Sequence, residues 1–145
     1  MRYVEIDPET GAVSWESYFD YLSSARTRFS PDLYHYIANR EHYKPEGRNS
    51  LHGGWLIGVQ LGYRSQDLVL AFVGPWHDRK HVMTYVGVKS YTINLEVGFR
   101  AGERDVLAHE FRVEERLVIH EVAFRNSQSL RIICEDVLPV TEVLS

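Results

Sequence analysis

The spacing of apolar residues changes along the chain, from a helical pattern near the amino terminus to a strand pattern after residue 54. Between residues 14 and 29, large apolar side chains recur at helical spacing, which predicts a helix with one buried face. Beyond residue 54, apolar and polar residues alternate, as in strands with one covered face. The helical stripe comprises Trp15, Tyr18, Phe19, Leu22 and Phe29.

Two start signals divide the helical part. Ser14 can cap a first helix, because a serine hydroxyl accepts hydrogen bonds from the free N–H groups of a first turn. Ser30-Pro31-Asp32 combines a cap, a proline at the first helical position and an acid that favours the helix dipole. The second helix should then run to roughly Asn39. We expect the two helices, within about residues 14–40, to form one compact hairpin.

The strand pattern follows a polar, glycine-containing loop at 41–54, and a short edge strand is also predicted at 2–6. We expect an α+β fold, with the helical hairpin packed on a largely antiparallel sheet of about six to eight strands. The chain should form a single domain, 1–145, with the sheet at about 54–136. Strands are expected at 55–63, 67–73, 81–86 and 90–97, then a glycine-rich loop around Gly98 and Gly102, then a three-stranded meander over 106–135.

The meander is the segment that comes nearest to showing a chemical site. Side chains of a strand alternate between faces, so the apolar rows of 106–113 and 117–124 coincide only in certain registers. A turn that pairs Val113 with Arg116 satisfies this condition. It places His109 directly opposite His120.

The next turn extends the same row. A three-residue loop at Asn126-Ser127-Gln128 puts Leu130 and Ile132 on the apolar face, whereas a two-residue loop would put them on the opposite face. With the three-residue loop, Cys134 lies beside His120. We therefore expect the two histidines and the cysteine to form one row across three strands.

Two imidazoles and a thiolate are ligands that zinc accepts, and a fourth position could hold water. His109, His120 and Cys134 are thus the candidate metal ligands, with zinc as the candidate cofactor. The alternative is core packing, because the row lies among apolar residues and free cysteine is commonly buried. Glu110 and Glu121 point to the opposite face, where we expect pairs with Arg112, Arg125 or Arg131 on a solvated surface.

Composition excludes several classes of function. The chain has 145 residues, enough to bury about 68% of its unfolded surface without disulfides or metals. Its net charge is −4 and its basic residues are scattered, so nucleic acid is not an expected partner. No run approaches the roughly 20 apolar residues of a membrane span, and no secretion signal is recognisable. With one cysteine, no internal disulfide can form, and we expect a cytoplasmic protein.

The segment Gly74 to His81 gathers two histidines, one acid and two bases into a loop between strands. His77, oriented by Asp78, could act as a general base, and Arg79 could bind an anionic substrate, so these three are the candidate catalytic residues. Alternatively, His77, Arg79, Lys80 and His81 could hold a phosphate or carboxylate. The simpler interpretation is a solvated turn in which Trp76 packs on the sheet.

Ser50 and His52 lie just before the first main strand. A serine and a histidine two positions apart do not form a nucleophile and base by themselves, because the pair must be within hydrogen-bond reach and the histidine must be oriented by a third group. Motifs of nucleotide binding and of helical zinc sites are absent. A turn that starts the strand is the better interpretation.

Five motifs follow one another along the chain: Ser50-Leu51-His52, Gly74-Pro75-Trp76-His77-Asp78-Arg79, Tyr85-Val86-Gly87-Val88-Lys89-Ser90-Tyr91, Asp105-Val106-Leu107-Ala108-His109-Glu110 and His120-Glu121. In this order they resemble a group of small bacterial α+β proteins that has no assigned activity. Such proteins look similar to the immunity and interaction modules of bacterial toxin systems. Gly53-Gly54 departs from the Asp-Ala expected after His52, so an acid that would partner this histidine is missing.

We expect a non-enzymatic binding or interaction module, of immunity type, with a protein as its partner, because the common catalytic motifs are absent. The alternative is a small metal-dependent or acid–base enzyme that uses the histidine row or the His77-Asp78-Arg79 loop. A homodimer formed through an exposed sheet edge is compatible with both functions.

Overall fold

The structure is a computed structural model that describes residues 1–62, 65–95 and 105–144. Within these ranges the protein is mostly sheet with a smaller helical part, and all three sheets are antiparallel. The helices are α1 (Glu16–Ser24) and α2 (Pro31–Ile37), with short 3-10 turns at Arg26–Arg28, Arg40–Tyr43 and Arg125–Ser127. The strands are β1 (Glu5–Ile6), β2 (Val13–Ser14), β3 (Trp55–Leu61), β4 (Leu68–Val73), β5 (Arg79–Val86), β6 (Ser90–Asn94), β7 (Val106–Glu114), β8 (Leu117–Phe124), β9 (Ser129–Cys134) and β10 (Asp136–Val143).

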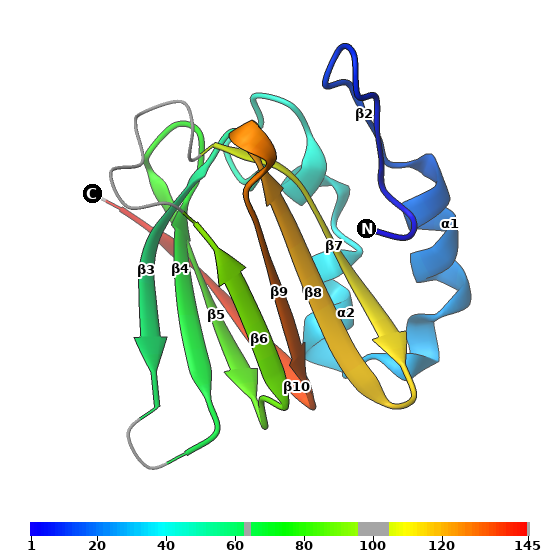
Figure 1. Cartoon of the computed structure of the whole chain (residues 1–145), viewed down its shortest axis with the longest axis vertical. Coiled ribbons are helices and arrows are strands. Elements are labelled where there is room, and N and C mark those ends of the chain that lie inside the picture. Colours follow the sequence, from blue (N-terminus) through cyan, green and yellow to red (C-terminus); the bar gives the residue numbers. More distant parts are fainter. Residues whose placement is uncertain (63–64, 96–104, 145) are drawn as a thin grey trace.

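Two four-stranded sheets pack face to face and enclose the core (Figure 1). The β3 sheet has the strand order β10-β5-β4-β3, and the β7 sheet has the order β6-β9-β8-β7. The antiparallel α+β prediction is confirmed, but the strands do not form one sheet of six to eight. Helices of nine and seven residues are too short to cover so large a sheet, and the two sheets instead cover each other. Fully buried core side chains include Leu68, Leu70, Phe72, Met83, Tyr85, Phe111, Ile132 and Val137.

The helices contact different sheets, so the predicted compact hairpin is not confirmed. Helix α1 lies beside β7, where the hydroxyl of Tyr18 accepts a hydrogen bond from the Phe111 N–H at 2.9 Å. Helix α2 lies beside β10. Pro31 is at the start of α2 as predicted, but the Ser30 hydroxyl donates to Asp136 Oδ1 at 2.8 Å and does not cap the helix. Ser14 belongs to β2, and Trp15 is the residue before α1.

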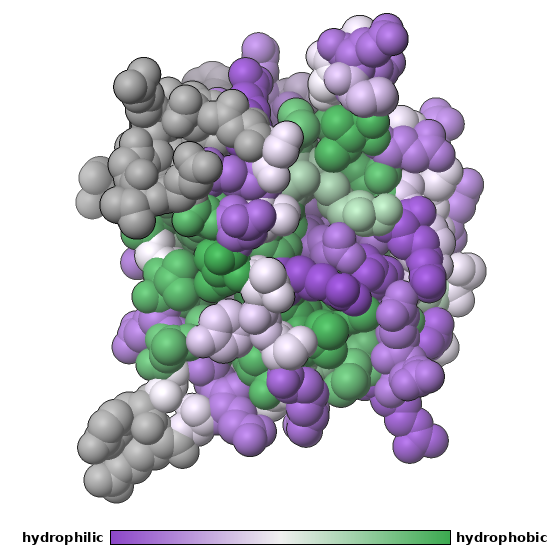
Figure 2. Space-filling model, viewed as in Figure 1, coloured by the Kyte–Doolittle hydropathy of each residue, from purple (hydrophilic) through white to green (hydrophobic). Residues whose placement is uncertain are grey.

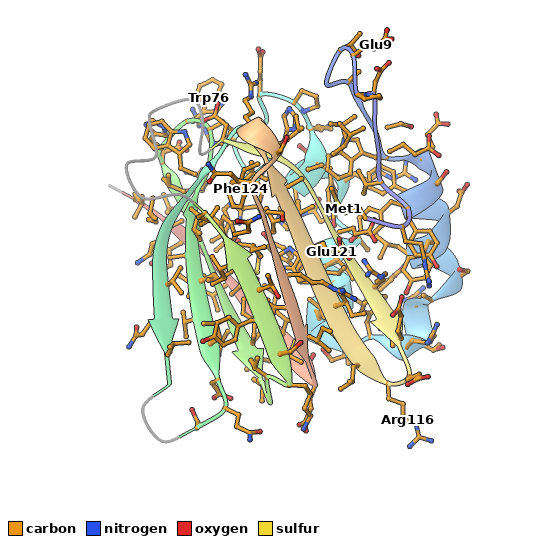
Figure 3. The ribbon with its side chains drawn as sticks, viewed as in Figure 1. Met1, Glu9, Trp76, Arg116, Glu121 and Phe124 are labelled. Atoms are coloured by element: carbon orange, nitrogen blue, oxygen red, sulfur yellow. The ribbon has the colours of Figure 1, made fainter. Side chains whose placement is uncertain are left out.

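The β7–β8 turn differs from the prediction. Glu114 pairs with Leu117, and only Glu115 and Arg116 form the loop, with φ values of 48° and 70°. Two successive positive φ angles are typical of type I′ turns, whose twist matches that of the flanking strands. Figure 3 shows Arg116 at the tip of this hairpin. The predicted pairing of Val113 with Arg116 is therefore wrong by two residues.

The shifted register changes the predicted row of ligands. A shift by two keeps every side chain on its face, so both histidines remain in the core. However, His120 lies opposite Phe111, and His109 lies opposite Val122. The prediction that His109 and His120 are directly opposite each other is wrong.

The β8–β9 loop has three residues as predicted, but it consists of Arg125–Ser127 and is displaced by one residue. Leu130 and Ile132 are buried, which confirms their assignment to the apolar face. Cys134 pairs with Val118 and not with His120, so its predicted position in the row is wrong.

Strand β10 was not predicted, since the sheet was expected to end near residue 136. It pairs along its full length with β5, and Pro139 is tolerated because β10 is an edge strand. At the opposite edge, the predicted apolar face of β3 is present but uncovered. Ile57, Val59 and Leu61 are 49%, 47% and 58% exposed, and Figure 1 shows β3 lying beyond the facing sheet. The predicted strand residues Tyr63 and 96–97, with the loop around Gly98 and Gly102, lie outside the described residues.

Gly54 fixes the junction between the helical part and β3. A Cβ added at Gly54 would lie 2.4 Å from the Val73 carbonyl oxygen and 3.0 Å from that of Leu51. Because both contacts are to backbone, Gly54→Ala should destabilise the fold by about 1–3 kcal/mol. Gly58→Ala is the matched control, since a Cβ there meets only the Ala71 Cβ at 3.7 Å. Urea unfolding of the two variants tests this, and equal stabilities would contradict it.

Candidate functional site

Two core histidines and a tyrosine form a hydrogen-bonded chain between the sheets. The Tyr85 hydroxyl lies 2.6 Å from His120 Nδ1, and His120 Nε2 lies 3.2 Å from His109 Nδ1. All three side chains have no exposed area. His120 stacks on Phe111 with ring centroids 3.7 Å apart, and His109 stacks on Tyr43 at 5.2 Å. The two histidines of the predicted row are thus in contact, but diagonally across β7 and β8 and not as directly paired residues.

A second pair of histidines lies toward helix α2. The Tyr36 hydroxyl is 2.9 Å from His81 Nδ1, and His42 Nδ1 donates to the Tyr36 carbonyl at 2.8 Å. The hydroxyl of Thr141 lies 3.3 Å from the same His81 nitrogen. A cleft between α2 and β10 reaches Tyr36, His42 and Thr141. His42 lies in a 3-10 turn within a segment predicted as loop, and its burial could not be predicted from that polar segment.

Burial keeps these histidines neutral. It lowers the pKa of His109 to about 3, an effect to which the neighbouring His42, His81 and His52 add. It lowers the pKa of His81 to about 4, with smaller contributions from His42 and Arg79. Burial also lowers the pKa of His42, and takes that of His120 well below the ordinary value. A histidine with so low a pKa is a poor general base at neutral pH, because it releases its proton too readily.

Burial favours the neutral thiol form of Cys134. Burial, with a smaller contribution from Asp136, raises its pKa to about 12, and its sulfur lies 3.8 Å from the Val118 carbonyl oxygen. The Nε2 atoms of His81 and His109 are buried without a hydrogen-bond partner. Even so, no three His, Cys, Asp or Glu side chains within the described ranges are placed to hold one metal ion.

The His77-Asp78-Arg79 loop forms a surface turn whose acid is already paired. The Asp78 carboxylate contacts Arg48 Nε at 3.0 Å and Arg79 Nη1 at 3.2 Å. His77 is exposed, has a φ of 58°, and lies with its ring 4.4 Å from that of Trp55. None of these contacts joins Asp78 to His77, so they do not orient the His77 ring.

The other predicted members of this loop lie elsewhere. His81 points into the core, so the prediction that it shares an anion with His77 is wrong. Trp76, predicted to pack on the sheet, is 58% exposed and lies at the edge of the molecule (Figure 3). The Arg48 guanidinium lies over its ring at 4.7 Å. Alternation along β5 explains the burial of His81, because the odd-numbered residues 81, 83 and 85 of this strand face the core.

Ser50 and His52 are used by the backbone. The Ser50 hydroxyl donates to the His42 carbonyl at 3.0 Å and accepts from the His52 N–H at 3.0 Å. His52 Nδ1 lies 2.7 Å from the Leu107 carbonyl oxygen. These bonds hold the turn before β3, in agreement with its interpretation as a strand-initiating turn.

The outer face of the β7 sheet carries a charged cluster around Arg112. Its guanidinium contacts Glu110 at 3.0 Å and Glu114 at 3.1 Å, and it also pairs with Glu121. Glu110 is fully buried and accepts further hydrogen bonds from the N–H groups of residues 2–4, at 2.9–3.0 Å. The predicted pairing with Arg112 is confirmed, but Glu110 is not solvated. Figure 2 shows hydrophilic atoms over this region, and Figure 3 shows Glu121 there.

The outer face of the β3 sheet is less charged. Two rows of residues cross its four strands without a charged side chain, whereas the next row of the same face carries the pair Lys80 and Glu142, 4.0 Å apart. Leu138 and Val140 are 45% and 54% exposed, and the inner members of the rows are partly exposed. The first row consists of Leu138, Thr84, Val69 and Gln60. The second row consists of Val140, Val82, Ala71 and Gly58. We call these eight residues the apolar face.

The sequence contained one signal for this face. Residues 68–73 of β4 are six consecutive apolar residues, which is typical of strands covered on both sides. In the structure only the inner side of β4 is covered, since Val69 and Ala71 are partly exposed. The run was predicted as a strand, but burial of both its faces was not predicted.

No family model matches the chain, and no curated protein matches it either. Neither helix in the described ranges has the length and hydrophobicity that a membrane crossing needs. The candidate site therefore rests on the geometry alone.

Proposed function

We propose that the protein is a non-enzymatic interaction module that binds a protein through the apolar face of the β3 sheet. The observation that carries this proposal is the absence of charge from both rows, combined with the exposure of Leu138 and Val140. Contiguous exposed apolar surface is rare on soluble proteins and marks sites of association. An immunity-type role in the cytoplasm, neutralising a toxin, is the specific form of this proposal that agrees with the resemblance in the motifs.

The buried polar groups support a binding function over the enzymatic alternative. The histidines hydrogen-bond to tyrosines and to each other, and burial keeps them neutral. Asp78 is held by two arginines, and Ser50 bonds only to backbone. These contacts have structural roles that require no substrate, although Asp78 Oδ1 and the Nε2 atoms of His81 and His109 are buried without a hydrogen-bond partner.

A matched pair of surface variants tests the proposal. Val140→Lys places a charge in the apolar face, and Thr92→Lys places one on the outer face of the β7 sheet, where Thr92 pairs with Arg131. Both side chains are exposed, so neither change should unfold the protein. A protein that the wild type captures from a lysate of the organism of origin should be identified and purified. Its affinity should then be measured for the wild type, for Val140→Lys and for Thr92→Lys.

We expect Val140→Lys to weaken binding of the purified partner by about 100-fold, because a buried unpaired charge is strongly unfavourable, while Thr92→Lys binds as the wild type does. Equal affinities of the wild type and Val140→Lys would exclude this face. Specific turnover of a small molecule that is lost on replacement of His77 would favour the enzymatic alternative.

A further inference from the structure

The cleft between helix α2 and strand β10 has a volume of about 580 Å³, and the described residues that line it include neither lysine nor arginine. Helix α2 contributes Asp32 and Tyr36, and the 3-10 turn that follows contributes His42. Strand β10 contributes Thr141. A volume of this size is typical of small-molecule sites, in which a few polar groups fix the orientation of the ligand. The hydrogen-bonding capacity of these four residues therefore indicates the kind of ligand that fits.

His42 supplies the first hydrogen-bond acceptor of the cleft. Its Nδ1 lies 2.8 Å from the Tyr36 carbonyl oxygen, and because a carbonyl oxygen can only accept, Nδ1 carries the hydrogen. Burial lowers the pKa of His42, so its ring is neutral at pH 7 and Nε2 has a free lone pair. The side chain is only 7% exposed, and Nε2 has no hydrogen-bond partner among the described residues. A nearly buried imidazole thus presents an unpaired acceptor to the cleft.

Two hydroxyl groups supply the second acceptor. The hydroxyl oxygens of Tyr36 and Thr141 lie 2.9 Å and 3.3 Å from the same atom, His81 Nδ1. Each hydroxyl oxygen has two lone pairs, and the contact with His81 occupies at most one of them. Thr141 is exposed and lines the cleft, so its oxygen keeps a lone pair for a ligand.

Asp32 supplies the third acceptor together with a negative charge. It precedes Tyr36 by four residues, and residues four apart project from the same face of a helix. Its carboxylate is exposed and makes no ion pair with any described residue. The other polar side chains of the wall, His35 and Asn39, carry no permanent positive charge. A cation that donates several hydrogen bonds matches this set of groups.

We propose that the cleft between α2 and β10 binds a primary alkylammonium group, whose three N–H donors are directed at the Asp32 carboxylate, His42 Nε2 and the Thr141 hydroxyl oxygen. The charge-assisted hydrogen bond to the carboxylate is the strongest of the three. Residues 138–140 of β10 provide an apolar wall for the alkyl chain. A free alkylamine and a lysine side chain carry the same group, so either can supply it. The proposal does not depend on the function proposed for the apolar face.

The probe for this site is n-butylammonium chloride, which reproduces the lysine side chain from Cβ to Nζ. Two control ligands isolate its chemistry, because n-butanol lacks the charge and trimethylbutylammonium keeps the charge but has no N–H donor. NMR spectra of the backbone amides, recorded during titration of the wild type, locate the binding and measure it. We expect saturable shifts within residues 32–42 and 138–141, with a Kd of about 1 mM and binding about 10-fold or more weaker for both controls.

Two pairs of variants test the named acceptors. Asp32→Asn keeps the shape of the side chain and removes its charge, and Asp20→Asn makes the same change at an exposed position of α1 outside the cleft. We expect Asp32→Asn to weaken binding of n-butylammonium about 10-fold or more, while Asp20→Asn binds as the wild type does. Thr141→Val should weaken it about 3-fold, while Thr84→Val, on the outer face of the same sheet, has no effect.

The absence of saturable shifts in the wild type, equal binding of trimethylbutylammonium, or equal affinities of the two aspartate variants would overturn the proposal. The blocked amino acid Nα-acetyl-lysine methylamide then identifies the source of the group. Binding as tight as that of n-butylammonium, or tighter, assigns the site to a lysine side chain. Weaker binding assigns it to a free alkylamine, because the peptide groups of the blocked lysine would not fit.

Discussion

Acidification from pH 7 to pH 5 should remove much of the stability of this protein, before most carboxylates titrate. Burial lowers the folded-state pKa values of His109 and His81 to about 3 and about 4, whereas an unfolded histidine titrates near pH 6.5. Between these values the unfolded chain binds more protons, so stability is fully present above about pH 6.5 and falls as the pH decreases. Each of these two histidines should contribute a loss of about 2 kcal/mol at pH 5.

The other two core histidines act in the same direction, since burial lowers the pKa of both His42 and His120. Urea unfolding at pH 7, 6 and 5 measures the combined loss. His81→Gln should reduce the slope of stability against pH by nearly one proton. A stability that is constant between pH 7 and pH 5 would show that the histidines are not buried as described.

Arg112→Met should cause the largest loss of stability of any single substitution proposed here, about 3–5 kcal/mol at pH 7. The guanidinium contacts Glu110, Glu114 and Glu121, and its removal leaves the fully buried carboxylate of Glu110 without its cation. The three backbone N–H groups that remain on Glu110 offset only part of this effect.

Arg131→Met is the matched control for that variant. The Arg131 side chain is 50% exposed and lies 3.9 Å from the shared partner Glu121, so its loss should cost less than about 1 kcal/mol. Chemical denaturation of both variants measures the difference. Equal losses would mean that the charged cluster behaves as an ordinary surface network, as the sequence had suggested.

The faces of the strands could be predicted from the sequence, but their register could not. The alternation of apolar residues in β7 and β8 placed His109 and His120 in the core, where both are found. The turn has positive φ angles at Glu115 and Arg116, and this pair lacks the asparagine or glycine that usually identifies a type I′ turn. A shift by two residues preserves every face, so hydrophobic pattern alone cannot detect it.

The division of the strands into two sheets could not be predicted from the sequence for a similar reason. A period of two shows that a strand has a covered side, but it does not show whether a helix or a second sheet covers it. Strand β10 was missed because Pro139 interrupts the pattern, although proline is acceptable on an edge strand. The apolar face also could not be assembled from sequence, because its two rows combine residues from four strands whose pairing only the structure provides.

The most direct test of the account is the rate at which a cysteine at position 140 reacts with a maleimide. Cys134 is buried and its thiol has a raised pKa, so an introduced cysteine is the only reactive thiol expected among the described residues. Val140→Cys and Thr92→Cys place the probe on the outer faces of the two sheets. The labelling rate in dilute solution should be compared with the rate under associating conditions, which are high protein concentration or the presence of a purified partner.

If the apolar face is an interface, Val140→Cys will react several-fold more slowly under the associating conditions, while Thr92→Cys reacts at the same rate under both. Equal rates for Val140→Cys in all conditions, with association still present by sedimentation or titration, would contradict the account. The binding surface would then have to be sought elsewhere on the molecule.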